Sequence, residues 1–156
     1  MTVTFLTVGS PSRGWVADGV DHYTRFLSKY ATVELLAVKP VTLRGTDADT
    51  VRKVEAVRLL AKAAKLTGVR IACDANGTSF TSETFATALR QQLDHHSGRA
   101  IVMIGGPYGL GKSVLRSADL VWSFGPATLP HELALLTAME QIARAFSILR
   151  GESYHK

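Results

Sequence analysis

Residues that could bind phosphates are concentrated in a glycine-rich stretch near residue 110. The stretch reads Gly105-Gly-Pro-Tyr-Gly-Leu-Gly-Lys-Ser113, and from Gly106 onward it satisfies the pattern G-x-x-x-x-G-K-[ST]. In a phosphate-binding loop of this pattern, backbone N–H groups and the lysine hold phosphates, while the hydroxyl group binds Mg²⁺. A P-loop nucleotide-binding protein is therefore one interpretation of this chain.

The surroundings of the glycine-rich stretch favour a different role for it. A P-loop enzyme needs a second strand that ends in an aspartate, but Asp119 opens the next strand-like run and Asp74 ends an earlier one. Forty-three residues follow Ser113, too few for the strands and the lid that such an enzyme usually adds. The glycines would equally allow a tight turn whose backbone approaches some other ligand closely.

A second set of reactive side chains lies near the C-terminus, where Arg144, Tyr154, His155 and Lys156 are found. The imidazole of His155 has the intrinsic pKa best suited to a general base near neutral pH, about 6.5. The arginine and the lysine could hold phosphates. Taken alone, a tail of this composition is typical of a frayed and solvated chain end.

Positive charge is concentrated in residues 39–70, where eight Lys and Arg residues face three acidic ones in a chain of net charge +5. If the segment is a helix, Arg58, Lys62 and Lys65 lie on one face. Another face carries Val54, Val57, Ala61 and Ala64. The basic stripe, defined as Arg58, Lys62 and Lys65, could follow an RNA backbone or could simply be a solvated helix face.

The composition is that of an ordinary globular protein. With 156 residues, 46% of them hydrophobic and 20% charged, the chain predicts a single domain over residues 1–156. A single cysteine, Cys73, excludes an internal disulfide framework and a zinc site built from cysteines, and we expect no metal. No apolar run approaches the roughly 18 residues of a membrane span, and the first residues lack a basic start, so a cytoplasmic protein is expected.

Strand-like and helix-like segments alternate along the chain and must position these residues. The predicted strands are 3–8, 33–38, 69–73, 100–104 and 120–124. The predicted helices follow residues 10–12, cover 49–66 and 82–95, begin after Gly111, and include 135–149. This alternation predicts an α/β fold, a mostly parallel sheet with helices on both faces. In such sheets ligands bind beyond the carboxyl ends of the strands, where the glycine-rich stretch lies.

Three motifs together resemble the RlmH family, small SPOUT-class methyltransferases of ribosomal RNA. They are Ile104-Gly-Gly-Pro-Tyr-Gly-Leu110, Thr128-Leu-Pro-His131 and Tyr154-His-Lys156, and the similarity extends over nearly the whole chain. The resemblance implies a C-terminal trefoil knot whose loops bind S-adenosyl-L-methionine. It also implies methylation of the N3 atom of a pseudouridine in large-subunit (23S) ribosomal RNA. The partners implied are the ribosome and a second copy of the chain, whose tail would complete the site.

The resemblance also assigns roles to single residues. Its cofactor-binding positions are Cys73, Gly105, Phe124, Gly125, Pro126, Ala127, Thr128 and Leu129. A side chain at Gly105 would block the close approach of the cofactor, and Lys112 would be an ordinary helix residue. His155 would be the base, assisted by Tyr154 and Arg144. Lys156 would contact the RNA, as would the basic stripe.

Three places depart from the family pattern. Gly125-Pro126 stiffens a loop where the family has small polar residues. Leu135 stands where the family often has arginine, and Ala143 where it often has tyrosine. A ribosome-binding module without catalytic activity is therefore a third interpretation, beside the methyltransferase and the P-loop protein.

Overall fold

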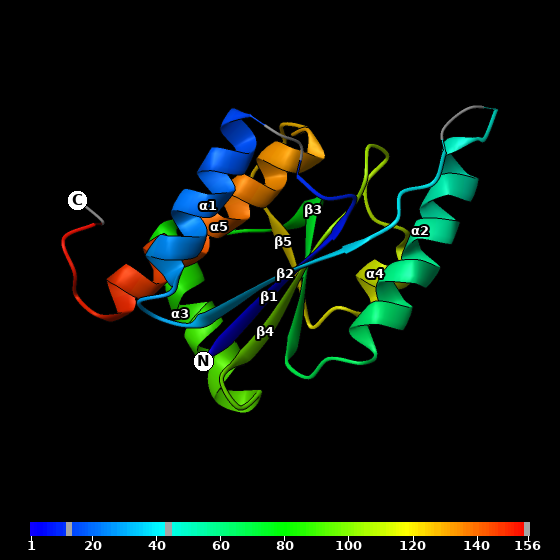
Figure 1. Cartoon of the computed structure of the whole chain (residues 1–156). Helices are drawn as coiled ribbons and strands as arrows, with labels where there is room; N and C mark the ends of the chain where they lie inside the picture. Colours follow the sequence, from blue (N-terminus) through cyan, green and yellow to red (C-terminus); the bar gives the residue numbers. More distant parts are fainter. Residues whose placement is uncertain (12–13, 43–44, 155–156) are drawn as a thin grey trace.

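One parallel sheet of five strands runs through the centre of the molecule, as the computed structural model shows (Figure 1). The structure describes residues 1–11, 14–42 and 45–154. The strands lie in the order β2-β1-β4-β3-β5. Their bounds are β1 Thr2–Val8, β2 Thr32–Val38, β3 Val69–Ser79, β4 Arg99–Ile104 and β5 Leu120–Ser123. The parallel α/β sheet predicted from the sequence is confirmed.

Helices cover both faces of this sheet, which confirms the second half of the fold prediction (Figure 1). One layer holds α1 (Trp15–Leu27), α3 (Ser82–His95) and α5 (His131–Leu149), and the other holds α2 (Ala48–Ala63) and α4 (Lys112–Ser117). Alternate side chains of β1 serve the two layers: Phe5 packs in the cluster under α1 and α5, and Leu6 in the cluster under α2. The period of two along the strand therefore builds two separate cores.

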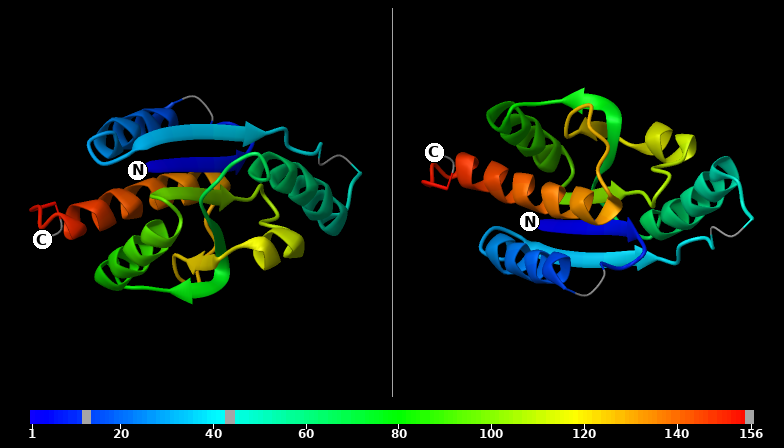
Figure 2. Two further views of the ribbon diagram at one scale, coloured as in Figure 1. Left: turned by 90° about the horizontal axis from the view of Figure 1, so that it is seen from below. Right: turned by 90° about the horizontal axis from the view of Figure 1, so that it is seen from above.

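The last helix, α5, returns from the edge of the sheet to lie between α1 and α3 (Figure 2). Its length and its buried side chains follow from apolar residues at helical spacing, among them Met139, Ile142 and Phe146. Leu135 and Ala143 are also fully buried in this core. These two departures from the family pattern thus concern core packing. The trefoil knot implied by the resemblance stays a prediction.

Strand β3 is longer than predicted from the sequence. It continues past Cys73 and ends at Ser79. Its pairing with β5 shifts register between Cys73 and Thr78, and both residues pair with Trp122. Gly77 permits this bulge: a Cβ there would lie 2.5 Å from the carbonyl oxygen of Val121. The polar residues of the bulge suggested the end of the strand, so the prediction of a strand ending at Cys73 was wrong.

Candidate active site

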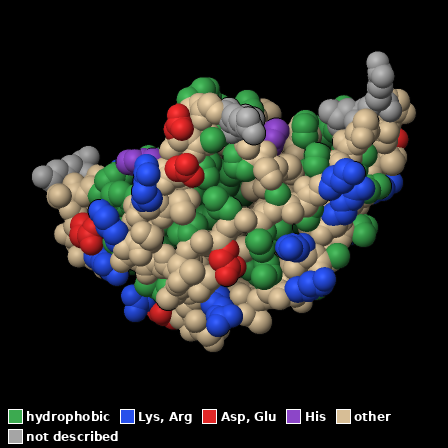
Figure 3. Space-filling model, in the orientation of Figure 1, with side chains coloured by type: hydrophobic (Ala, Val, Ile, Leu, Met, Phe, Trp, Pro, Cys, Tyr) green, Lys and Arg blue, Asp and Glu red, His purple; other side chains and the backbone are tan. Residues whose placement is uncertain are grey.

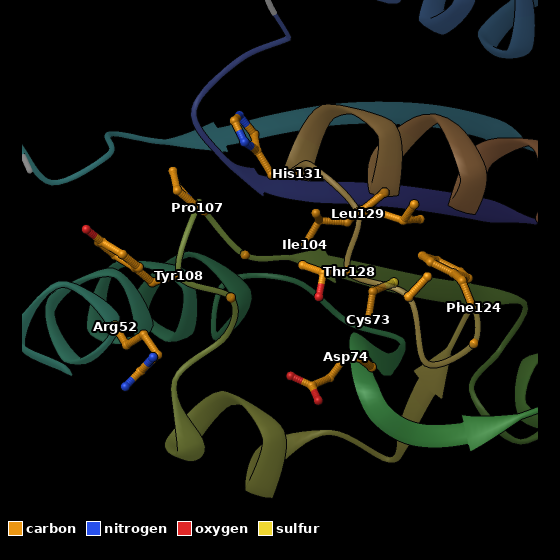
Figure 4. Close-up of a pocket in the computed structure, with 17 residues that line it drawn as sticks. Arg52, Cys73, Asp74, Ile104, Pro107, Tyr108, Phe124, Thr128, Leu129 and His131 are labelled. Carbon is orange, nitrogen blue, oxygen red and sulfur yellow. The ribbon is translucent and has the colours of Figure 1, made fainter. Parts of the chain in front are cut away.

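A cavity of about 270 Å³ lies where the bulge of β3 and the ends of β4 and β5 meet the start of α5 (Figure 4). It occupies the carboxyl edge of the parallel sheet, where ligands of such folds bind. Most of the cofactor positions implied by the resemblance line it, namely Cys73, Gly105, Phe124, Gly125, Ala127, Thr128 and Leu129. The eighth position, Pro126, is exposed and does not line it. The fold thus brings together residues that lie more than fifty positions apart in the chain.

The loop after β5 is tied to the bulge of β3 by one buried side chain, Ser123. Its hydroxyl group donates to the carbonyl oxygen of Ala75 at 3.0 Å and accepts the N–H of Gly125 at 3.1 Å. Gly125 has φ of +114°, a conformation that favours glycine. Two walls of the cavity are therefore held in a fixed relation by Ser123, a residue that sequence reasoning did not select.

Aromatic rings support the same loop from the core side. Trp122 stacks on Phe85 with ring centroids 3.8 Å apart, and the Phe124 ring meets Trp122 edge-on at 4.6 Å. This geometry fixes Phe124 at the cavity wall.

Cys73 forms part of the wall as a neutral thiol. Burial raises its pKa strongly, and the neighbouring carboxylate of Asp74 raises it further. The thiolate is therefore absent near neutral pH, and Cys73 offers a polarisable apolar surface but no nucleophile.

The glycine-rich stretch forms a tight turn between β4 and α4. The N–H of Gly109 donates to the carbonyl oxygen of Gly106 at 2.9 Å, which closes the turn. A Cβ on Gly105 would lie 2.5 Å from the carbonyl carbon of Gly109 and 2.7 Å from the amide nitrogen of Leu110. A side chain at Gly105 would therefore strike the other limb of the turn. That it would also block the approach of the cofactor stays a prediction.

The position of Lys112 weighs against the P-loop interpretation. Lys112 is exposed, does not line the cavity, and begins a helix of six residues, α4. So short a helix has little dipole to stabilise bound phosphates. The glycine-rich turn therefore contributes its backbone to the wall of the cavity and does not bind phosphate through Lys112.

Four ionisable side chains that sequence reasoning did not assign to the site also line the cavity, namely Arg52, Asp74, Tyr108 and His131. Asp74 and Arg52 lie on one side of it and His131 on the other (Figure 4). The guanidinium of Arg52 pairs with Asp49 at 3.2 Å. Asp74 could have been found, because it directly follows a predicted strand. Nothing in the sequence marks Arg52, which reaches the cavity from the opposite layer.

Arg144 and Tyr154 lie together at the far end of α5, away from the cavity. Nε of Arg144 donates to Oε1 of Glu140 at 3.0 Å, and the Tyr154 hydroxyl donates to the same oxygen at 3.2 Å. The guanidinium carbon lies 5.0 Å from the centre of the Tyr154 ring. Arg144 follows His131 by thirteen residues, which is about 20 Å along the helix axis. Arg144 and Tyr154, which the resemblance assigns to catalysis, are therefore not brought to the cavity of their own chain.

Both groups keep their protons at neutral pH. The hydrogen bond with Glu140 raises the pKa of Arg144 above its ordinary value. Burial raises the pKa of Tyr154, and its bonds with Tyr23 and Glu140 raise it further. Arg144 is therefore a permanent cation and Tyr154 a hydrogen-bond donor. His155 and Lys156 lie outside the described residues.

Arg58 and Lys62 of the basic stripe lie on α2, where Lys and Arg side chains gather on one face of the molecule (Figure 3). Lys65 follows the helix, because α2 ends at Ala63 and not at residue 66 as predicted. Lys62 and Lys65 are exposed, and Arg58 donates to the carbonyl oxygen of Lys39 at 2.7 Å. None of the three lines the cavity. The apolar face that includes Val57 is exposed as well, with 67% of that side chain accessible.

Neither a metal centre nor a membrane span is found within the described ranges. No group of three or more His, Cys, Asp or Glu residues in 1–11, 14–42 and 45–154 could hold a metal ion. Over the same residues, no helix combines the length and the apolar character that crossing a membrane requires.

Comparison with solved structures supports the fold. A probable methyltransferase from Bordetella pertussis Tohama I superposes with a TM-score of 0.57 over 93% of this chain and 95% of that one, at 17% identity. A probable methylase family protein from Haemophilus influenzae Rd KW20 gives 0.54 over 99% of this chain and 70% of that one, at 12% identity.

Comparison of sequences identifies the family. Residues 1–155 match the family model described as "Predicted SPOUT methyltransferase". The chain is 38% identical to the ribosomal RNA large subunit methyltransferase H of Lysinibacillus sphaericus, with both chains covered completely. The protein of that name from Gemmatimonas aurantiaca is also 38% identical over the full length of both chains. The chain therefore belongs to the SPOUT methyltransferase family and, as its motifs predicted, to the RlmH group within it.

Proposed function

We propose that the chain is an S-adenosyl-L-methionine-dependent methyltransferase that methylates the N3 atom of a pseudouridine in large-subunit ribosomal RNA. The observation that carries this function is the full-length match to relatives named ribosomal RNA large subunit methyltransferase H. It acts as a single domain, in the cytoplasm, where its ribosomal substrate is found.

The lining of the cavity fits the cofactor. Adenine and the methionine chain need apolar walls and backbone hydrogen-bonding groups, which Ile104, Phe124 and Leu129 and the adjoining loops offer. The carboxylate of Asp74 complements a ligand with positive charge. A Cβ on Gly109 would meet no atom within 4 Å, so the turn leaves space on that side. When bound, S-adenosyl-L-methionine supplies an electrophilic methyl group on a sulfonium.

The residues of the tail act on the RNA. The N3 atom of pseudouridine is a poor nucleophile until it loses its proton, so a base and a cation near it accelerate the reaction. His155 has the intrinsic pKa for this base. Tyr154 donates a hydrogen bond or stacks on the base, while Arg144 and Lys156 hold phosphate or the developing negative charge.

A second copy of the chain brings this tail to the cavity. In one chain, Arg144 lies about 20 Å along α5 from His131 at the cavity, and Tyr154 packs against Arg144. A two-fold dimer is the simplest assembly that joins the two ends, and it gives two equivalent composite sites. Trp15, with 66% of its side chain exposed at the start of α1, is apolar surface that a partner would cover.

Melting temperatures distinguish this function from a P-loop protein. At a concentration of S-adenosylhomocysteine 100-fold above its Kd, we expect the melting temperature to rise by about 5–10 °C. ADP with Mg²⁺ should leave it unchanged. A rise with ADP and none with S-adenosylhomocysteine would contradict the methyltransferase.

The basic stripe is expected to contribute to ribosome binding. Changing Arg58, Lys62 and Lys65 together to Gln should weaken binding to the large subunit and reduce the slope of log K against log salt by about two to three. The matched control changes Arg90 and Lys112, which are exposed cations outside the stripe. Filter binding over a range of salt concentrations measures the affinity and the salt slope of each variant. An unchanged slope for the stripe variant would mean that the stripe is only a solvated face.

A further inference from the structure

The carboxyl group of Glu55 is buried behind the cofactor cavity. This residue of α2 is 2% exposed. Its Oε1 accepts the N–H of Val41 at 3.0 Å, whereas Oε2 has no hydrogen-bond partner among the residues that the structure describes. Buried carboxyl oxygens are normally satisfied, so this arrangement points to a second role for the group.

The second oxygen faces the glycine-rich turn. A Cβ on Gly106 would lie 2.8 Å from Oε2 of Glu55 and 3.2 Å from Cγ1 of Val8. Gly106 lines the cavity, and its carbonyl oxygen accepts the N–H of Gly109 that closes the turn. The carboxyl group therefore lies directly behind the backbone that forms one wall of the cavity, at the place that a side chain on residue 106 would take.

Helix α2 supports the turn at its other end too. A Cβ on Gly111 would lie 2.8 Å from the carbonyl oxygen of Arg52 and 2.8 Å from Cβ of Ala56. The backbone of the turn thus rests on α2 at two points, Gly106 and Gly111. The bond to Val41 keeps the Glu55 carboxyl group from rotating away from the first of them.

We propose that Glu55 is a positioning residue of the cofactor site, whose carboxyl group sets the position of the Gly106 backbone and so the shape of the cavity wall. Glu55 does not line the cavity, so it acts through the turn and not on the ligand. This inference rests on the proposed function, because binding of S-adenosylhomocysteine reports the shape of the wall.

The test is a paired substitution, read out as S-adenosylhomocysteine affinity by calorimetry. Gly106→Ala places a methyl group against Oε2 and should lower the affinity about tenfold. Glu55→Asp is one methylene shorter and withdraws the carboxyl group, so the double variant should recover most of the affinity. Glu55→Gln has the same length as Glu and should recover none.

A neighbouring glycine provides the matched control. Gly105→Ala places its methyl group against the backbone of Gly109 and Leu110, so Glu55→Asp should not restore binding to that variant. The inference is overturned if Gly106→Ala binds S-adenosylhomocysteine as tightly as the wild type does. It is equally overturned if the changes in binding free energy caused by Gly106→Ala and Glu55→Asp simply add in the double variant. It is also overturned if Glu55→Asp restores both glycine variants equally. Failure of the wild-type protein itself to bind S-adenosylhomocysteine would overturn the proposed function.

Discussion

Removal of Tyr154, His155 and Lys156 is expected to lower methyl transfer by about two to four orders of magnitude. The deletion takes away the base and the donor that act on the nucleobase. S-Adenosylhomocysteine affinity should stay at the wild-type level, because Tyr154 does not line the cavity of its own chain and the partner's tail acts on the nucleobase and not on the cofactor. Transfer of a tritiated methyl group and calorimetry measure the two quantities. A loss of activity below about tenfold would contradict a catalytic tail.

Mixing two defective proteins tests whether the tail acts across the dimer. One partner lacks the tail, and the other carries Gly105→Val with its tail intact. If the tail acts on the other subunit, each mixed dimer has one complete site, and equal mixing should restore about a quarter of the wild-type sites. If the tail acts within its own chain, mixing restores nothing, and the composite site is wrong.

Gly105→Val is expected to lower S-adenosylhomocysteine affinity by about two orders of magnitude. Any Cβ at this position would lie 2.5 Å from the carbonyl carbon of Gly109, so a branched side chain forces the two limbs of the turn apart. The clash is local to the turn, so the far-UV circular dichroism spectrum should match that of the wild type. Calorimetry measures the affinity, and wild-type binding would contradict the role of the turn as a cavity wall.

Lys112→Ala in the same segment is the matched control for Gly105→Val. Lys112 is exposed and lies outside the cavity lining, so its removal should change affinity and methylation by less than about twofold. A loss of more than about tenfold would support the P-loop interpretation, in which this lysine is indispensable.

The periodicity of apolar residues was sufficient to predict the layered sheet. All five strands and all five helices of the described chain appear close to their predicted places, and α3 has the predicted bounds, Ser82–His95. The extension of β3 could not be predicted, because its bulge depends on contact with Val121 in a strand that follows much later in the chain. The spacing of apolar residues in α2 predicted a helix but could not show which of its faces packs against the sheet. The face with Val57 is exposed, while Glu55 is enclosed by the turn.

The cavity was predicted less completely than the fold. The motifs indicated the loops after β4 and β5, and both loops do line the cavity. Arg52 could not be found from sequence, since its approach depends on the packing of α2 beside the turn. The distance between the cavity and Arg144 likewise emerges only when α5 is seen as one continuous helix. That separation is what makes a second subunit part of the proposed mechanism.

Methylation of ribosomal RNA by the purified protein tests the central claim most directly. The wild-type protein is incubated with tritiated S-adenosyl-L-methionine and with large subunits or ribosomes from cells that lack a functional copy of it. We predict incorporation approaching one methyl group per large subunit, and mass spectrometry of nuclease fragments should place that group on N3 of a pseudouridine. A protein that binds S-adenosylhomocysteine yet transfers no methyl group to free RNA, large subunits or ribosomes would contradict the account.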